Sequence, residues 1–151
     1  METTDGSQPP TRLRATPSWL LTQTAAHAAR LVTEGLGRID ARGYHYRLLA
    51  ALEEYGPASQ AELGRRCGID RSDVVAALNE LAARDLVRRS PDPTDRRRNI
   101  VTMTAAGERE LHRIAHTLTR IQDDLLAPLT PTERDQLSRL LTRVLHHHSR
   151  P

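Results

Sequence analysis

The sequence predicts a mainly α-helical protein with one small two-stranded β hairpin. Apolar residues recur at steps of three and four in six separate segments, which is the spacing of amphipathic helices. One interval, between Leu86 and Thr104, instead contains two short strand-like runs joined by proline and aspartate. The chain has 151 residues, of which 38% are hydrophobic and 27% charged, so it can bury a core as one folded unit.

The N-terminal third predicts a tail and two helices. Residues 1–16 are rich in Thr, Ser, Pro and Gly and lack apolar periodicity, so we expect a flexible tail. Pro17 suits the first turn of a helix that continues to about Leu36. A second, short helix is predicted from Tyr44 until the Gly-Pro pair at 56–57.

The next two helices predict a helix-turn-helix. Ser59 and Glu62 form a capping box that starts a third helix, which ends at Gly68. Asp70 is expected to cap a fourth helix. The predicted buried stripe of that helix consists of Val74, Ala77, Leu78 and Leu81. Two short helices about a glycine turn are typical of a DNA-binding helix-turn-helix.

The predicted hairpin carries the excess positive charge of the chain. Its strands are expected at 86–90 and 100–104. All 22 basic residues are arginine, and the window 84–98 holds six arginines against three aspartates, which equals the whole net charge of +3. Because the planar guanidinium suits phosphates and base edges, this cluster favours a nucleic-acid partner. The alternative is that these arginines only solvate the tip of the hairpin.

Two further helices complete the chain. Leu111, Ile114, Leu118, Ile121 and Leu125 mark a long helix from Ala105, and Thr130 with Glu133 caps a final helix that ends in His146, His147 and His148. The terminal helices carry more apolar surface than so small a central motif covers. We therefore expect burial against a second copy of the chain.

This order of elements resembles the MarR family of winged helix-turn-helix transcriptional regulators, over residues 18–147. The most specific part is the run from Leu86 through Arg89, then Asp95-Arg96-Arg97 and Val101 to Gly107. The resemblance implies a homodimer formed by the N- and C-terminal helices and a palindromic double-stranded DNA operator. The domains expected are a tail at 1–16, dimerisation helix 1 at 17–41, a DNA-binding lobe at 42–104, C-terminal dimerisation helices at 105–148 and a tail at 149–151.

The resemblance also assigns DNA contacts. The fourth helix would enter the major groove, where the residues facing base edges are expected to be Arg71, Ser72, Asp73, Val75, Ala76 and Asn79. Arg71 and Asn79 are the foremost candidates. Family members commonly have threonine and arginine where this chain has Val75 and Ala76, so the direct readout of bases is expected to be less polar than is usual in the family. The wing would contribute Arg96, Arg97 and Arg98, with Arg97 in the minor groove and Asp95 as support.

Four histidines predict a zinc site. His112 and His116 are four residues apart on one helix face, and His27 and His45 fall on the inner sides of the first two helices. This layout resembles the zinc-sensing branch of the family, in which zinc would act as co-repressor. That branch usually has a carboxylate at the His27 position, and its second site uses a cysteine that this chain lacks there. The alternative is that all four are ordinary hydrogen-bonded histidines.

Other functions have weaker signals. A small aromatic or phenolic anion could instead bind between Trp19, His45, Tyr46 and Arg88 and release the DNA. A zinc hydrolase would need a glutamate base inside the helical histidine pair, where none stands, so we expect no enzyme. An architectural DNA binder would lack a ligand site.

Targeting signals and cysteine content indicate the cellular compartment and the cysteine chemistry. It has no membrane-spanning run and no signal peptide, so the cytosol is expected. The single cysteine, Cys67, excludes an internal disulfide and is expected to be structural rather than redox-active.

Overall fold

The chain folds into a lobe of three helices and a small sheet, attached to a helical arm. The structure is a computed structural model that describes residues 7–150. Its elements in chain order are α1 (Thr11–Arg14), α2 (Pro17–Gly37), α3 (Gly43–Tyr55), β1 (Ala58–Ser59), α4 (Gln60–Cys67), α5 (Arg71–Ala83), β2 (Val87–Pro91), β3 (Asn99–Met103), α6 (Ala105–Leu125) and α7 (Pro131–His148). The prediction of a mainly helical winged helix-turn-helix is confirmed.

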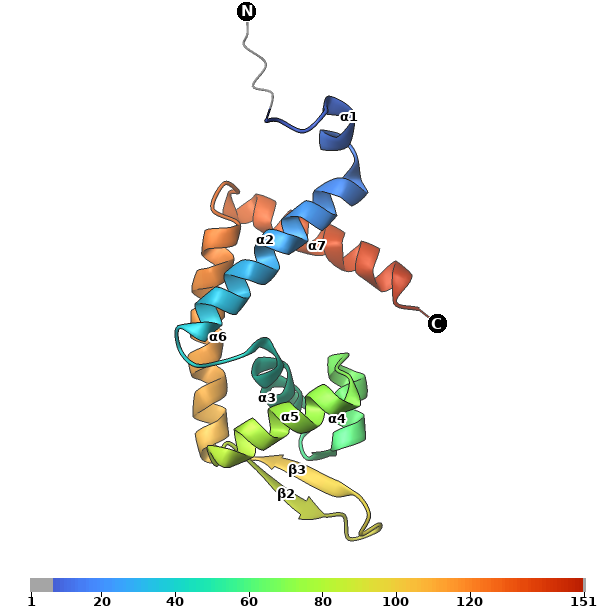
Figure 1. The fold of residues 1–151 in the computed structure, drawn as a ribbon, viewed down its shortest axis with the longest axis vertical. Coiled ribbons are helices and arrows are strands. Elements are labelled where there is room, and N and C mark those ends of the chain that lie inside the picture. Colours follow the sequence, from blue (N-terminus) through green and yellow to red (C-terminus); the bar gives the residue numbers. More distant parts are fainter. Residues whose placement is uncertain (1–6, 151) are drawn as a thin grey trace, which may run out of the picture.

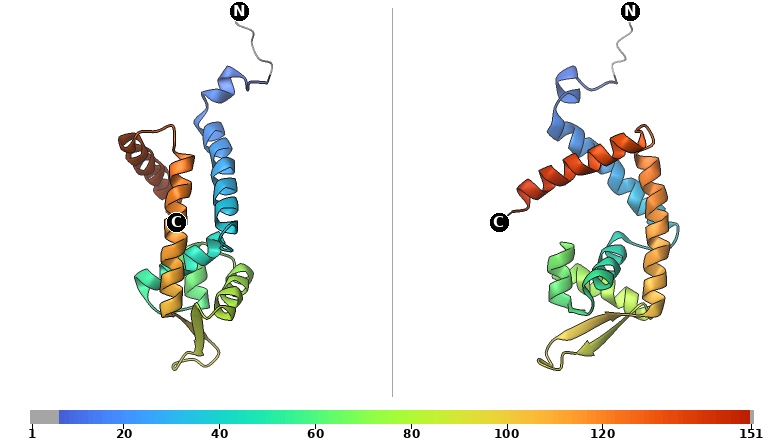
Figure 2. Two further views of the ribbon diagram at one scale, coloured as in Figure 1. Left: turned by 90° about the vertical axis from the view of Figure 1, so that its left-hand side faces the viewer. Right: turned by 180° about the vertical axis from the view of Figure 1, so that it is seen from behind.

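The lobe consists of α3, α4, α5 and a small antiparallel sheet, and the arm consists of α2, the distal part of α6, and α7 (Figure 1). In both views of Figure 2, α6 runs from the lobe into the arm and lies beside α2. The lobe holds the core, where the fully buried side chains include Leu48, Leu49, Leu63, Leu78 and Val101. None of the helices in the described residues is long and apolar enough to cross a bilayer.

Helix boundaries agree with the local signals in the sequence. Both predicted capping boxes form: Ser59 accepts from the Glu62 backbone at the start of α4, and Thr130 does the same with Glu133 at the start of α7. Gly68 ends α4 in the left-handed conformation, at φ 63°. Asp70 precedes α5 as expected, but its side chain makes no capping hydrogen bond, so that part of the prediction is wrong.

The sheet and the N-terminal segment differ from expectation in detail. The sheet has three strands in the order β1-β3-β2, because the two residues of β1 pair with Val101 and Ile100. The wing, which we define as β2, β3 and the turn between them, starts and ends one residue from the predicted limits. Within the predicted tail, α1 forms one helical turn that the sequence did not predict; residues 1–6 lie outside the described residues.

An ion cluster around the buried Glu110 carboxylate joins the arm to the lobe in the first half of α6. Arg113 donates two hydrogen bonds to the Glu110 carboxylate, at 3.0 and 2.6 Å, and a third to the Ile39 backbone oxygen at 2.9 Å. Arg84, which caps the end of α5, lies 3.6 Å from the same carboxylate. The hydrogen bonds from Arg113 hold the pKa of Glu110 below its ordinary value, despite burial. Glu110 and Arg113 of α6 therefore link the end of α5, through Arg84, to the loop after α2, through the Ile39 carbonyl.

Candidate nucleic-acid interface

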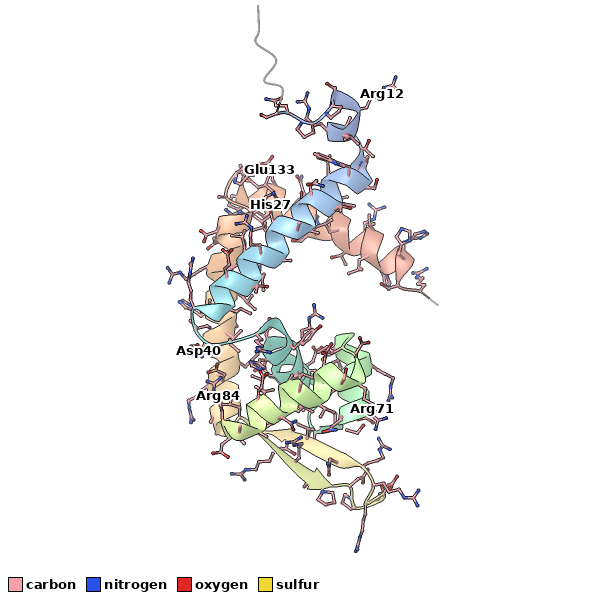
Figure 3. All side chains as sticks on the ribbon, in the orientation of Figure 1. Arg12, His27, Asp40, Arg71, Arg84 and Glu133 are labelled. Carbon is pink, nitrogen blue, oxygen red and sulfur yellow. The ribbon has the colours of Figure 1, made fainter. Side chains whose placement is uncertain are left out.

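Helix α5 presents one polar face to solvent. Val74, Ala77, Leu78 and Leu81 face the core as predicted. Of the six predicted base readers, Arg71, Ser72, Ala76 and Asn79 are exposed, whereas Asp73 and Val75 are half-buried. Arg71 starts the helix and Arg84 follows its other end, as the labels in Figure 3 show. The exposed face thus runs along the helix from Arg71 and Ser72 at its start to Asn79 on its third turn, and the N-terminal end of a recognition helix is the part that reaches base edges.

The turn of the wing is ordered by aspartates. Asp92 accepts hydrogen bonds from the backbone and hydroxyl of Thr94, which lower the pKa of Asp92. Asp95 accepts a hydrogen bond from the backbone of Arg97 at 3.0 Å, so it supports the turn that carries this arginine. Within the described residues, the side chains of Arg96 and Arg97 make no hydrogen bond or ion pair, and both are exposed.

Arg98 makes contacts within the protein that the sequence did not predict. Its guanidinium donates to the Ser59 hydroxyl at 3.0 Å and lies 3.8 Å from the Glu62 carboxylate. Ser59 and Glu62 are also the capping box of α4. Arg98 thus ties the wing to the start of α4, and its charge is partly balanced inside the protein. Its predicted contact with DNA remains untested.

A second arginine ties the wing to α5. The Arg89 guanidinium on β2 donates to the Asn79 side-chain oxygen at 2.7 Å. The sequence analysis predicted that Asn79 contacts base edges and did not list Arg89 among the DNA contacts. No sequence signal pairs these two residues, since the contact depends on how the hairpin lies against the helix.

A groove of about 740 Å³ lies between α4, the start of α5 and the wing. Arg65, Arg71 and Arg98 line it, with Asp70 as the acidic residue among its lining. The groove, the exposed turns of α5 and the wing together form a basic surface suited to a polyanion.

His45 holds α3 against α5. It is buried, and its Nε2–H donates to the Glu80 carboxylate at 2.7 Å, while Arg42 lies 3.2 Å from the other oxygen of Glu80. Its Nδ1 is buried without a hydrogen-bond partner. Glu80 and Arg42 were missed by sequence reasoning because 35 residues separate the histidine from its carboxylate.

The structure does not bring the four histidines together. His27 lies midway along α2 (Figure 3), is exposed, and accepts a hydrogen bond from Arg30. His112 lies 3.4 Å from Glu53, and His116 is exposed one turn further along α6. Over residues 7–150, no three side chains of His, Cys, Asp or Glu are placed to share a metal ion. The side chains as placed therefore do not fit a tetrahedral site, and the zinc site stays a prediction.

The residues predicted to line an aromatic-anion pocket are also dispersed. Trp19 lies near the start of α2 and Arg88 lies on β2, and these two segments stand at opposite ends of the molecule (Figure 1). Tyr46 packs against the core of the lobe. One chain therefore cannot place Trp19 and Arg88 against the same small ligand.

Cys67 is placed as a structural residue. Its thiol donates to the Arg47 backbone oxygen at 3.3 Å, and it packs against the core. Burial raises the pKa of this thiol, which disfavours the reactive thiolate.

Comparison with known proteins adds the family. Residues 34–98 match the model of the MarR family. The repressor NicR of Pseudomonas putida is 35% identical over 97 residues, which cover 64% of this chain and 61% of NicR. The chain thus spans about three fifths of the curated relatives it matches, at 61% and 63% of their lengths.

Solved structures match over more of the chain. A probable transcriptional regulator from Pseudomonas aeruginosa has a TM-score of 0.76 at 32% identity, covering 88% of this chain and 99% of that one. BpsR of Bordetella bronchiseptica, whose DNA binding is regulated by 6-hydroxynicotinic acid, has a TM-score of 0.75 at 24% identity, covering 90% of this chain and 97% of its own, and shares the fold. These relatives are described as regulators of transcription or DNA binding, which agrees with the prediction that the chain is not an enzyme.

Proposed function

This chain belongs to the MarR family, and from that membership we propose that it is a sequence-specific, double-stranded-DNA-binding transcriptional repressor. One observation carries the proposal. The exposed first turns of α5 and the unpaired guanidinium groups of Arg96 and Arg97 are presented by one lobe, with the arginine-lined groove between them. A helix for the major groove and a basic hairpin for the adjacent minor groove are the two parts this mode of binding needs.

The parts would act differently on the duplex. Arg71 is placed to donate to a base edge, where a bidentate contact discriminates by about 1–3 kcal/mol. Arg97, held by Asp95, would enter a narrow A·T-rich minor groove. The half-buried Val75 and Asp73 would contribute less to base reading than the exposed positions.

The repressor would act as a homodimer on a palindromic operator. No residue of α7 is buried in the single chain, although Leu140, Leu141, Val144 and Leu145 are 41–68% exposed on it. Leu20 and Leu21 on α2 are also largely exposed. A folded chain seldom leaves two such apolar rows open. Because these side chains are about half exposed, burial of each in a partner contributes roughly half of the 1.5–3 kcal/mol expected for a fully exposed side chain. A second copy explains both rows at once.

Zinc control of DNA binding is a separate proposal. It rests on the His112 and His116 pair and on the unpartnered Nδ1 of buried His45. His45 would have to join ligands that now lie apart, so zinc binding would require movement of α2 or α6 relative to α3.

The test of the main proposal is selection of a preferred duplex from random double-stranded DNA, followed by titration at fixed salt. We expect a palindrome with half-sites about one helical turn apart. The variant with Arg96 and Arg97 both changed to Ala should lose affinity and show a smaller dependence on salt. Absence of any sequence preference in the wild-type protein would refute the proposal.

The same duplex tests the response to ligands. Titrations with chelator, with graded zinc and with phenolic acids separate the zinc proposal from its aromatic-anion alternative. We expect zinc to strengthen binding and His112→Ala to abolish that effect, with His146→Ala as the control at the C-terminal histidines. An unchanged zinc response in His112→Ala would refute the ligand assignment.

A further inference from the structure

We propose that Asn79 is a positioning residue, which holds the Arg89 guanidinium against a backbone phosphate between the two grooves that α5 and the wing enter. The proposal rests on the DNA-binding function proposed above and adds to it. It reassigns Asn79, which the sequence placed among the base readers, and it gives Arg89 a role.

The contact is short and directed. Arg89 Nη1 donates to Asn79 Oδ1 at 2.7 Å, which is within the range of charge-assisted hydrogen bonds. Arg89 stands opposite Val101 in the ladder between β2 and β3, on the same side of the wing as the buried Val87 and Val101. Because side chains alternate along a strand, Arg88 points to the other side. Arg89 is thus the arginine of β2 that faces α5.

The Arg89 guanidinium is held by a neutral partner, unlike three other arginines that join separate elements. Arg42, Arg84 and Arg98 each lie near a glutamate, at Glu80, Glu110 and Glu62. Among the described residues, the hydrogen-bond partner of Arg89 is a neutral amide, and no carboxylate pairs with it. A guanidinium has five N–H donors, so four remain after the bond to Asn79. An oriented, uncompensated cation of this kind suits a phosphate.

The bond also constrains Asn79. Bidentate reading of adenine uses the amide oxygen as acceptor and the amide nitrogen as donor, in one plane. The hydrogen bond to Arg89 directs the amide plane of Asn79 toward the wing. Asn79 therefore cannot hold Arg89 and read an adenine in the same orientation.

The position of Asn79 along α5 favours a role at a backbone phosphate over the reading of a base. Asn79 is eight residues after Arg71, which is about 12 Å along the helix axis at 1.5 Å per residue. If Arg71 reaches the floor of the major groove, the Asn79–Arg89 pair lies further back, where α5 meets the wing. The sugar-phosphate strand that separates the two grooves passes between these elements.

The test is a double-mutant cycle on the selected duplex, measured at several salt concentrations. We expect Arg89→Ala to lower affinity about tenfold and Asn79→Ala about fivefold, because a hydrogen bond to a charged group is lost in each case. The double variant should lose about tenfold in total rather than the product of the two. In Arg89→Ala, the slope of log affinity against log salt concentration should decrease by about one, the value for the loss of one phosphate contact. The base preference should stay the same in both single variants.

Arg88→Ala is the matched control, since it removes a neighbouring arginine that faces away from α5. Its effect should multiply with that of Asn79→Ala. A multiplicative loss in the Asn79→Ala, Arg89→Ala double variant would overturn the inference, as would a changed base preference in Asn79→Ala. Either result leaves the repressor proposal standing, provided that the wild-type protein selects a sequence. If the wild-type protein binds no duplex, both proposals fail.

Discussion

Replacement of Gly107 by alanine should destabilise the protein through a backbone clash at the base of the wing. Gly107 is buried in the first turn of α6, and its N–H donates to the Thr104 hydroxyl at 3.0 Å. A Cβ at this position would overlap the Leu86 carbonyl oxygen and lie 2.8 Å from Met103 Cγ. The same Leu86 oxygen accepts a hydrogen bond from the Thr104 backbone at 3.1 Å, so it cannot withdraw freely.

The expected magnitude is a balance of three contributions. Alanine in a helix is favoured over glycine by about 1 kcal/mol. Overpacking costs about 1–3 kcal/mol, and loss of the Thr104–Leu86 hydrogen bond costs about 1 kcal/mol. The net loss is about 1–3 kcal/mol, which for 151 residues lowers Tm by roughly 3–9 °C.

The assay is thermal unfolding followed by circular dichroism at fixed protein concentration, because the proposed dimerisation would make Tm depend on concentration. Gly37→Ala is the control, since a Cβ there meets nothing within 4 Å. That variant should match or exceed the wild-type Tm by the gain in helix propensity, up to about 1 kcal/mol. A Gly107→Ala protein that melts at or above the wild-type temperature would refute the reasoning.

Three further predictions follow from contacts described above. Glu110→Gln should lower stability by about 1–2 kcal/mol at pH 7, because the buried carboxylate accepts two hydrogen bonds from Arg113. The folded pKa of Glu110 is depressed, so this stabilisation is present above the unfolded pKa and is lost as pH falls through the folded pKa. The free energies of unfolding of the two proteins, measured by urea titration, should therefore converge in acid. A difference that stays constant with pH would contradict the assignment. Arg98→Ala should weaken DNA binding while changing Tm little, because the wing loses the hydrogen bond from the half-exposed Arg98 guanidinium to Ser59; unchanged binding would show that this bond is dispensable. Leu141→Glu, in the apolar row of α7, should shift the mass measured by light scattering from dimer to monomer, and a persistent dimer would place the interface elsewhere.

Much of the fold was predictable because its signals are local. The capping boxes at Ser59 and Thr130 each involve residues three apart, and the left-handed Gly68 ends α4 where a glycine was required. The strand β1 was missed because two residues carry no periodicity, and its existence depends on pairing with β3, more than 40 residues later. Asp70 has the residue type of a cap without making the bond, so residue type alone was insufficient there.

The candidate site was predictable only as far as helix periodicity reaches. Periodicity identified the exposed face of α5, but it could not show that Asn79 and Arg98 are engaged by other parts of the protein. The pairing of His45 with Glu80 joins two helices and leaves no trace in either. The four-histidine cluster was inferred from topology, whereas side-chain direction decides ligation, and His27 is directed to Arg30 on its own helix.

Helix α6 connects the base of the wing rigidly to the arm, so a rotation at one end is transmitted to the other. It continues without a break for 21 residues from the base of the wing into the arm, a length of about 31 Å at 1.5 Å per residue. A tilt of about 10° at the distal end would displace the base of the wing by about 5 Å. That displacement exceeds the rise between successive base pairs, about 3.4 Å. In the proposed dimer, a small change of angle at the interface would therefore move each lobe by more than one base-pair step along the double helix.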